Sequence, residues 1–353
     1  MTMQNKKAIQ DEMEAMGHLS LRAATGGCPY ENGESVQRYL AYYGLKFADT
    51  EHRIGWFESG GVRLAGQVWK KKIKNQKLKI KIEESPAAMD DFPKQDASAI
   101  LERGRALEIK SLETLVVVVH GYMNHTGQMR HLIGGLLDAG FAVGALDLPG
   151  HGLSEGKPAA GTIEAYARAV LDFAATAKAM GFGRLNLVGF STGCAAAVEG
   201  LLEGQDVFER VVLVSPLVRW QGFKASRITY SLYRPFMDKI KRVPQRNSSD
   251  EEFLYFNRHK DTLHCKHVSL DWVESMFTWN EKIARAAACK KPVLILQGDR
   301  DTTVDWRYNV RLLREKFPAA NVEMISGARH ELLNEAAEYR DKVVEKIVGY
   351  VGK

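Results

Sequence analysis

The chain has 353 residues, 45% of them hydrophobic, which is enough to bury a large core and indicates a globular protein. Its formal net charge of +6 is modest for this length and bears on partners and solubility more than on fold. No apolar run approaches the roughly 18 residues that span a bilayer, no signal-peptide pattern opens the chain, and the four cysteines show no disulfide or zinc-site spacing, so we expect a cytoplasmic protein with reduced thiols.

Residues 1–51 form a polar leader with two short helical patterns. The first begins its apolar spacing at Ile9. The second has Ser35 as a plausible N-cap and Gly44 where a helix C-cap would stand. We expect both helices to pack on the main domain, with a role in dimerisation as the alternative.

A β-hairpin and a charged insertion follow the leader. Residues 56–69 contain two strand patterns separated by Gly60 and Gly61, whose tolerance of positive φ suits a two-residue turn. The insertion, residues 70–111, begins with seven lysines and no acid between Lys70 and Lys81. Strict alternation over residues 78–82 predicts an edge strand guarded by lysines, and contact with an anionic surface is the alternative.

From Leu115 onward, apolar strand patterns alternate with helical ones. The predicted strands are 115–119, 142–146, 185–188, 211–214, 293–297 and 322–326. Such alternation indicates an α/β fold with a mostly parallel central sheet and helices on both faces. Residues 216–289 break the rhythm, and we interpret them as a cap inserted late in the sheet, so that the core comprises residues 52–215 and 290–353.

A serine nucleophile is predicted at Ser191. The segment Gly189-Phe190-Ser191-Thr192-Gly193 follows a strand and precedes a helix of small residues, as a nucleophile elbow requires. Glycines flank such a serine because its hydroxyl must project clear of a strained turn. An ordinary tight turn between strand and helix is the alternative.

A hydroxyl needs a base to take its proton and a carboxylate to orient that base. Asp301 and His330 each follow the carboxyl end of a predicted strand, where open α/β sheets place their sites. The order Ser, Asp, His is the one expected of α/β-hydrolases. Asp299 and Asp305 compete with Asp301 for the orienting role, and as alternatives they would be loop acids or helix caps.

An oxyanion hole is predicted from His120-Gly121-Tyr122, directly after strand 115–119. The backbone amides of Tyr122 and Thr192 would hold the developing negative charge. We expect the His120 side chain to brace this loop rather than act as a base.

The motifs HGYMNHTGQ, DLPGHGLSEG, GFSTG, GDRDTTVD and GARHELLNE together resemble the monoacylglycerol lipase and bacterial lysophospholipase group of α/β-hydrolases. The resemblance covers residues 52–69 and 112–353. It implies the α/β-hydrolase fold and a catalytic triad of Ser191, Asp301 and His330, with the amides of Tyr122 and Thr192 as the oxyanion hole. It also implies a loop-bracing role for His151.

The segment Arg219 to Arg246 carries eight basic residues and one acid, interleaved with aromatic and aliphatic residues. This composition suits a cap over an acyl pocket, or an interfacial segment facing anionic lipid. We therefore expect a lipid or other ester as substrate and contact with an anionic membrane through the cap and Lys70–Lys81. Nucleic acid is not an expected partner.

The sequence thus predicts a serine hydrolase that cleaves a monoacylglycerol or lysophospholipid through an acyl-serine intermediate, without a cofactor or a metal. The alternatives are a general carboxylesterase, a thioesterase or peptidase on the same scaffold, and a non-catalytic ligand-binding homologue.

Overall fold

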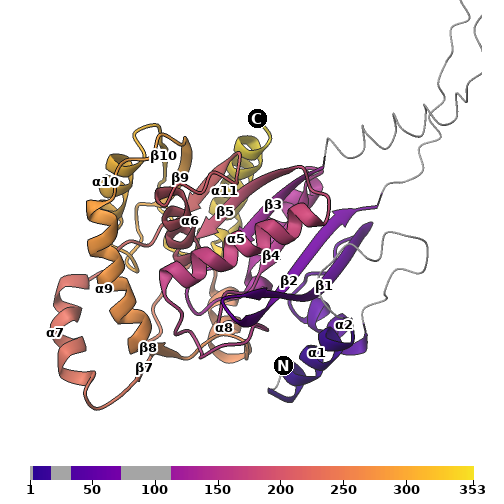
Figure 1. The fold of residues 1–353 in the computed structure, drawn as a ribbon, viewed down its shortest axis with the longest axis horizontal. Coiled ribbons are helices and arrows are strands. Elements are labelled where there is room, and N and C mark those ends of the chain that lie inside the picture. Colours follow the sequence, from indigo (N-terminus) through magenta and orange to yellow (C-terminus); the bar gives the residue numbers. More distant parts are fainter. Residues whose placement is uncertain (1–2, 17–32, 73–112) are drawn as a thin grey trace, which may run out of the picture.

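The computed structural model describes residues 3–16, 33–72 and 113–353, which are built around an eight-stranded sheet in the order β1-β2-β4-β3-β5-β6-β9-β10 (Figure 1). The strands are β1 (Thr50–Ser59), β2 (Val62–Lys71), β3 (Thr114–Val119), β4 (Ala142–Leu146), β5 (Arg184–Phe190), β6 (Val211–Val214), β9 (Val293–Gly298) and β10 (Asn321–Ile325). The β1–β2 hairpin is antiparallel and joins β4 antiparallel, whereas β4 to β10 pair in parallel. The predicted mostly parallel sheet is confirmed.

Helices cover both faces of this sheet, as the alternating pattern predicted. One face packs against α5 (Ile163–Ala179), α6 (Thr192–Leu202), α9 (Leu270–Arg285) and α10 (Trp306–Lys316). The other face packs against α1 (Met3–Met16), α2 (Glu34–Tyr42), α4 (Arg130–Asp138) and α11 (Ala337–Val351). Strand β3 serves both cores, because Val117 and Val116, as neighbours in a strand, point to opposite faces. This double burial explains the unbroken apolar run of β3.

The turn between β1 and β2 is formed by two glycines. The predicted two-residue turn of the hairpin is present, since Gly60 and Gly61 have φ values of +56° and +76°.

The start of α2 differs from the prediction. Ser35 is not the N-cap of α2: the N-cap is Gly33, two residues earlier, and the helix begins at Glu34. The Glu12 carboxylate of α1 accepts hydrogen bonds from the backbone amide of Ser35 at 2.7 Å, so a residue distant in sequence satisfies the helix start.

The leader helices are packed on the sheet. Ile9 and Met13 of α1 are fully buried, and they belong to the same hydrophobic core as α4 and α11. The C-cap of α2 is Tyr43 and not Gly44 as predicted, and Gly44 follows it with a φ of +66°, the left-handed conformation common just after a helix.

Between β6 and β9 the chain forms α7 (Phe223–Tyr233), β7 (Lys239–Lys241), α8 (Glu251–His259) and β8 (His267–Ser269) before α9. Strands β7 and β8 pair with each other and not with the main sheet. Helix α9 is anchored to the core because Trp279 Nε1 donates a 2.9 Å hydrogen bond to the buried carboxylate of Glu199 in α6. We call residues 216–289 the cap.

Most of the predicted charged insertion, including the strand predicted over residues 78–82, lies outside the described residues. At its described start, Lys70 pairs with Glu113 at 2.9 Å and Lys71 with Asp138 at 3.2 Å. None of the helices in the described ranges is both long and apolar enough to cross a membrane.

Candidate active site

Ser191 stands at the sharp turn between β5 and α6, with φ +50° and ψ −107°. A non-glycine residue rarely adopts a positive φ, so this backbone is strained. The turn also needs its two glycines, for a steric reason. A Cβ on Gly189 would lie 2.7 Å from the backbone of Gly193, and one on Gly193 would lie 2.4 Å from the carbonyl oxygen of Val119.

The structure brings the three predicted triad residues together. His330 Nε2 lies 3.1 Å from Ser191 Oγ, and His330 Nδ1 lies 2.7 Å from Asp301 Oδ2. All three side chains are almost completely buried, with relative exposures of 6% or less. This is the geometry in which a histidine takes a serine proton while a carboxylate fixes its tautomer.

Of the three candidate acids, Asp301 alone contacts His330 among the described hydrogen bonds and ion pairs. Asp299 accepts hydrogen bonds from the backbone amide of Gly327 and the hydroxyl of Ser326, and thereby ties two loops together. Asp305 is the N-cap of α10. Both therefore have the loop and cap roles that the sequence left open.

The Asp301 carboxylate is held by more than the histidine. Its Oδ1 accepts the backbone amides of Thr303 and Val304 at 2.8 and 3.1 Å, and Gln297 Nε2 donates to Oδ2 at 3.0 Å. Burial tends to raise the pKa of Asp301, but His330 and these donors lower it overall. Gln297 was not predicted from the sequence, since a glutamine at the end of a strand carries no distinctive signal.

The charge of His330 is set by opposing effects. Burial lowers the pKa of His330, whereas the adjacent Asp301 carboxylate raises it, and the net shift is upward from the usual 6.5. A base with a raised pKa accepts the serine proton more readily. The geometry and charge of the pair therefore suit general-base catalysis.

The predicted oxyanion amides have no acceptor in the described part of the chain. Neither the N–H of Tyr122 nor that of Thr192 forms a backbone or side-chain hydrogen bond there. The amide of Thr192 also opens α6, where the helix dipole favours negative charge. A Cβ on Gly121 would lie 3.2 Å from Ser191 Cβ, so this loop lies against the nucleophile.

Two other histidines near the site contact backbone atoms of the surrounding loops, as the predicted bracing role requires. His120 Nδ1 lies 2.7 Å from the carbonyl oxygen of Gly121, and its Nε2 accepts the backbone amide of Leu148 at 2.9 Å. His151 Nδ1 lies 3.0 Å from the carbonyl oxygen of Pro149. Burial lowers the pKa of both imidazoles to about 3.

The Tyr122 side chain joins the oxyanion loop to the cap, which the sequence did not reveal. Its ring stacks on Trp272 of α9, with centroids 3.7 Å apart and an interplanar angle of 14°. Its hydroxyl donates to the carbonyl oxygen of Ala159 at 2.8 Å and accepts the amide of Ser269 at 3.1 Å. The position of the Tyr122 amide, one of the two predicted oxyanion donors, thus depends on packing against the cap.

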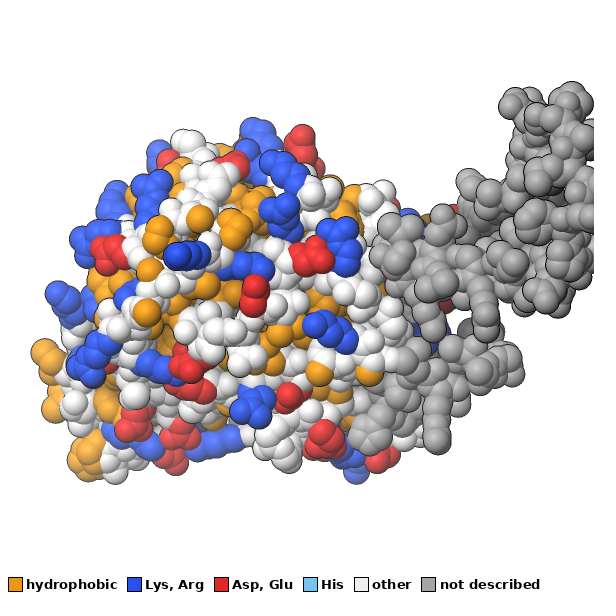
Figure 2. Space-filling model, turned by 45° about the horizontal axis from the view of Figure 1, so that its top comes forward, with side chains coloured by type: hydrophobic (Ala, Val, Ile, Leu, Met, Phe, Trp, Pro, Cys, Tyr) orange, Lys and Arg blue, Asp and Glu red, His pale blue; other side chains and the backbone are white. Residues whose placement is uncertain are grey.

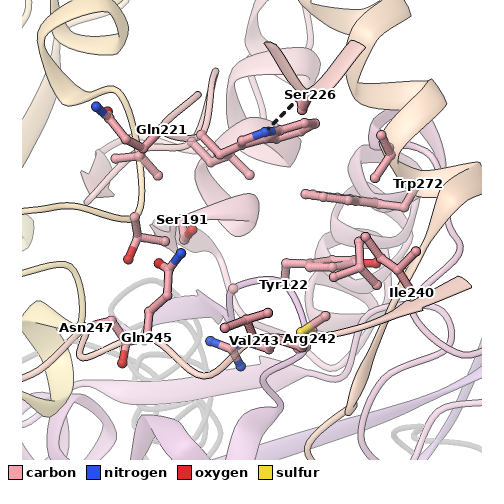
Figure 3. A pocket seen from close by; sticks show the side chains of 18 of the residues that line it. Tyr122, Ser191, Gln221, Ser226, Ile240, Arg242, Val243, Gln245, Asn247 and Trp272 are labelled. Carbon is pink, nitrogen blue, oxygen red and sulfur yellow. Dashed lines mark hydrogen bonds between the residues drawn. The ribbon is translucent and has the colours of Figure 1, made fainter. Parts of the chain in front are cut away.

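A cavity of about 370 Å³ opens beside Ser191 and His330, between the core and the cap (Figure 3). Apolar side chains of the cap line part of it: Leu217, Trp220, Tyr230, Ile240, Val268, Trp272 and Val273. Polar side chains also line it, among them Asn124, Arg242, Gln245, Asn247 and Glu331. Figure 3 shows Trp272 and Ile240 on one side of the cavity and Gln245 and Asn247 on the other.

Glu331, next to the predicted base, is a second buried carboxyl that the sequence did not single out. It accepts hydrogen bonds from the side-chain amides of Asn247 at 3.1 Å and Asn334 at 3.3 Å. Burial raises its pKa, so it tends toward the neutral form. We find no group of His, Cys, Asp or Glu in the described ranges that could hold a metal ion.

The chain is similar to known hydrolases in sequence and in structure. A family model described as serine aminopeptidase, S33, matches residues 110–337. The monoacylglycerol lipase of Paleococcus ferrophilus is 25% identical, with a TM-score of 0.59, 67% of this chain covered and 94% of that chain. A soluble variant of the monoglyceride lipase from Saccharomyces cerevisiae is 16% identical, with a TM-score of 0.64, 87% of this chain covered and 96% of that chain. No curated protein matches in the sequence search.

The Asp301–His330 pair predicts a specific pH profile. For the wild type, kcat/KM for an ester should fall as pH drops through a value above 6.5, because protonated His330 cannot accept the serine proton. Asp301→Asn should lower kcat on the order of 10⁴-fold. The acid limb of its residual activity should move to lower pH, because burial then acts on His330 without the carboxylate.

Asp299→Asn is the matched control for this experiment, since Asp299 contacts the loop and not the histidine. It should keep the wild-type acid limb. An acid limb that stays in place in Asp301→Asn would contradict the assignment of Asp301.

Proposed function

Because the chain belongs to the serine aminopeptidase S33 family of α/β-hydrolases, we propose that it cleaves the acyl ester of a lipid, a monoacylglycerol or a lysophospholipid. The single observation that carries this proposal is the cavity beside Ser191, which has Trp272 and Ile240 on one side and the amide side chains of Gln245 and Asn247 on the other (Figure 3). The apolar side suits an acyl chain, and the polar side suits the alcohol part of the ester. The 25% identity to a monoacylglycerol lipase adds support.

In the proposed mechanism, Ser191 Oγ attacks the ester carbonyl while His330 Nε2 accepts its proton. The amides of Tyr122 and Thr192 stabilise the resulting oxyanion, and Asp301 stabilises the imidazolium. The tetrahedral intermediate then collapses, and His330 returns the proton to the departing alcohol. Water, activated by the same histidine, attacks the acyl-serine and releases the fatty acid.

An aminopeptidase is the second candidate, because the family description names that activity. Such an enzyme would need a carboxylate to hold the substrate's ammonium group. Glu331 lines the cavity, but its pKa is raised by burial and the cationic Arg242 lines the same cavity. Both features disfavour an ammonium group, and the ester proposal is the better supported one.

We also propose that the cap contacts an anionic membrane surface. Helix α7 and the turn after it expose large apolar side chains, with relative exposures of 69% for Ile228, 65% for Leu232 and 84% for Phe236. Figure 2 shows hydrophobic and basic side chains side by side on the left of the molecule, where α7 lies. Apolar groups among cations are typical of segments that bind anionic lipid interfaces.

Hydrolysis of defined lipids tests the first proposal. Wild type should release fatty acid from 1-monoacylglycerols or lysophospholipids, with kcat/KM at least about tenfold higher for dodecanoyl than for butanoyl esters because each buried methylene adds about 0.8 kcal/mol. Ser191→Ala should lower kcat by at least about 10³-fold while its thermal unfolding matches wild type. Equal rates for both chain lengths would make the protein a general esterase, and no ester turnover by the wild type would favour a binding role.

Vesicle flotation tests the second proposal. Wild type should float with vesicles containing about 30% phosphatidylglycerol and much less with pure phosphatidylcholine vesicles. A triple variant with Ile228→Ser, Leu232→Ser and Phe236→Ser should bind the anionic vesicles at least about tenfold more weakly. Tyr255→Ser, which removes a 57% exposed aromatic residue from α8, is the matched control. Equal flotation with both kinds of vesicle would refute an anionic membrane contact.

A further inference from the structure

A second cavity, of about 240 Å³, lies beside the first and shares with it four residues of the segment 241–247. Four cations and no acid line it: Lys241, Arg242, Arg258 and Lys266. None of the four forms an ion pair with a carboxylate in the described part of the chain. We call this cavity the cationic recess. An excess of unpaired positive charge in a hollow favours an anion.

Arg242 is the residue that joins the recess to the active-site cavity, because it lines both. Its side chain is half-buried, and its guanidinium donates one hydrogen bond, at 2.8 Å, to His264 Nε2. Burial lowers the pKa of His264 to about 3, so this imidazole is neutral and contributes no charge of its own. The guanidinium therefore keeps donors for a further acceptor.

The charges of Glu331 and Arg242 affect each other's pKa, but no ion pair joins the two side chains. Glu331 lines the active-site cavity, but its carboxyl accepts amide hydrogen bonds from Asn247 and Asn334 and forms no ion pair with Arg242. Removing a cation from water costs free energy unless a carboxylate or other anion pairs with it. An anion that binds in the recess would offset this desolvation cost. Arginine forms paired hydrogen bonds with phosphate and carboxylate oxygens.

Asn257 also lines the recess. This residue is 9% exposed, and its Oδ1 is buried without a hydrogen-bond partner in the described residues. A buried amide oxygen without a donor is unusual.

The recess lies on the alcohol side of the proposed substrate. Among the apolar lining residues, Trp220, Tyr230 and Trp272 come from the start of the cap, α7 and α9, whereas Arg242, Gln245 and Asn247 come from the segment that borders the recess. Figure 3 shows Gln245 beside Ser191, with Asn247 on the same side of the cavity and Trp272 on the opposite side. An ester whose acyl chain follows the apolar side therefore directs its alcohol part toward Gln245 and Asn247, which also line the recess.

We propose that the cationic recess, through Arg242, Arg258 and Lys266, binds an anionic group, such as a phosphate, on the alcohol part of the ester. This inference rests on the proposed ester hydrolysis at Ser191. It narrows the substrate class to acyl esters whose leaving alcohol carries a negative charge. Neutral monoacylglycerols would then be the poorer substrates.

The test compares two octanoyl esters at concentrations below their micelle formation, so that attraction to charged aggregates plays no part. The substrates are 1-octanoylglycerol and its 3-phosphate. Wild type should show the higher kcat/KM for the phosphate ester. Arg242→Gln should lower the ratio of the two kcat/KM values about 10- to 100-fold, since hydrogen bonds to a charged group are lost.

Arg246→Gln is the matched control, because it removes the same charge from the same segment at a residue that lines neither cavity and pairs with Glu251 on the surface. It should leave the ratio unchanged. Combined Arg258→Gln and Lys266→Gln, at exposed positions, should lower the ratio in the same direction as Arg242→Gln and guards against a folding defect of that variant. A wild type that hydrolyses both esters equally, or a ratio that Arg242→Gln does not alter, would overturn the inference while the proposed hydrolysis stands.

Calorimetric binding of glycerol 3-phosphate, succinate and inorganic phosphate to Ser191→Ala separates the recess from catalysis. Glycerol 3-phosphate should bind most tightly of the three, and Arg242→Gln should weaken it about 10- to 100-fold. If succinate binds more tightly than glycerol 3-phosphate, the preferred anion is a carboxylate. If inorganic phosphate binds more tightly than glycerol 3-phosphate, the recess prefers a free anion. Either result overturns the assignment to a phosphate ester. If wild type hydrolyses no ester, the proposed function fails, and absence of glycerol 3-phosphate binding would then refute the recess as well.

Discussion

The turn at Ser191 is the constraint on which the site depends. Its φ of +50° is strained for a serine, and the close approach of Gly189 to Gly193 and of Gly193 to Val119 allows no side chain at either glycine. This turn aims the hydroxyl at His330 and frees the amide of Thr192 at the start of α6. The parallel sheet holds the turn in place, because β5 is bonded to a strand on each side.

The cap contacts the predicted oxyanion loop in addition to lining the cavity. Tyr122, which supplies one predicted oxyanion amide, is stacked on Trp272 and bonded to the amide of Ser269. A change in cap position would therefore shift the oxyanion loop as well as the cavity walls. The same cap presents apolar side chains outward on α7 and cations toward the recess, so one segment combines the proposed membrane, acyl and anion contacts.

The sequence predicted what local patterns determine. The alternation of apolar strand runs with helical patterns predicted the mostly parallel sheet. The positions of Ser191, Asp301 and His330 after strand ends predicted that they share one edge of this sheet, and the structure brings the three side chains together. It could not predict contacts between distant segments: Glu12 takes the capping role expected of Ser35, and Gln297 supports Asp301. The recess was missed for the same reason, because its cations and Asn257 converge only after the cap folds.

We propose that Ser191 is a nucleophile activated by His330. Reaction with a fluorophosphonate probe, followed by peptide mass spectrometry, tests this role without knowledge of the substrate. One label per chain on Ser191 is predicted for the wild type, none on Ser191→Ala, and labelling slowed at least about 10³-fold in His330→Ala. An unlabelled wild type would show that Ser191 is not a reactive nucleophile, and equal labelling of wild type and His330→Ala would show that His330 does not activate it.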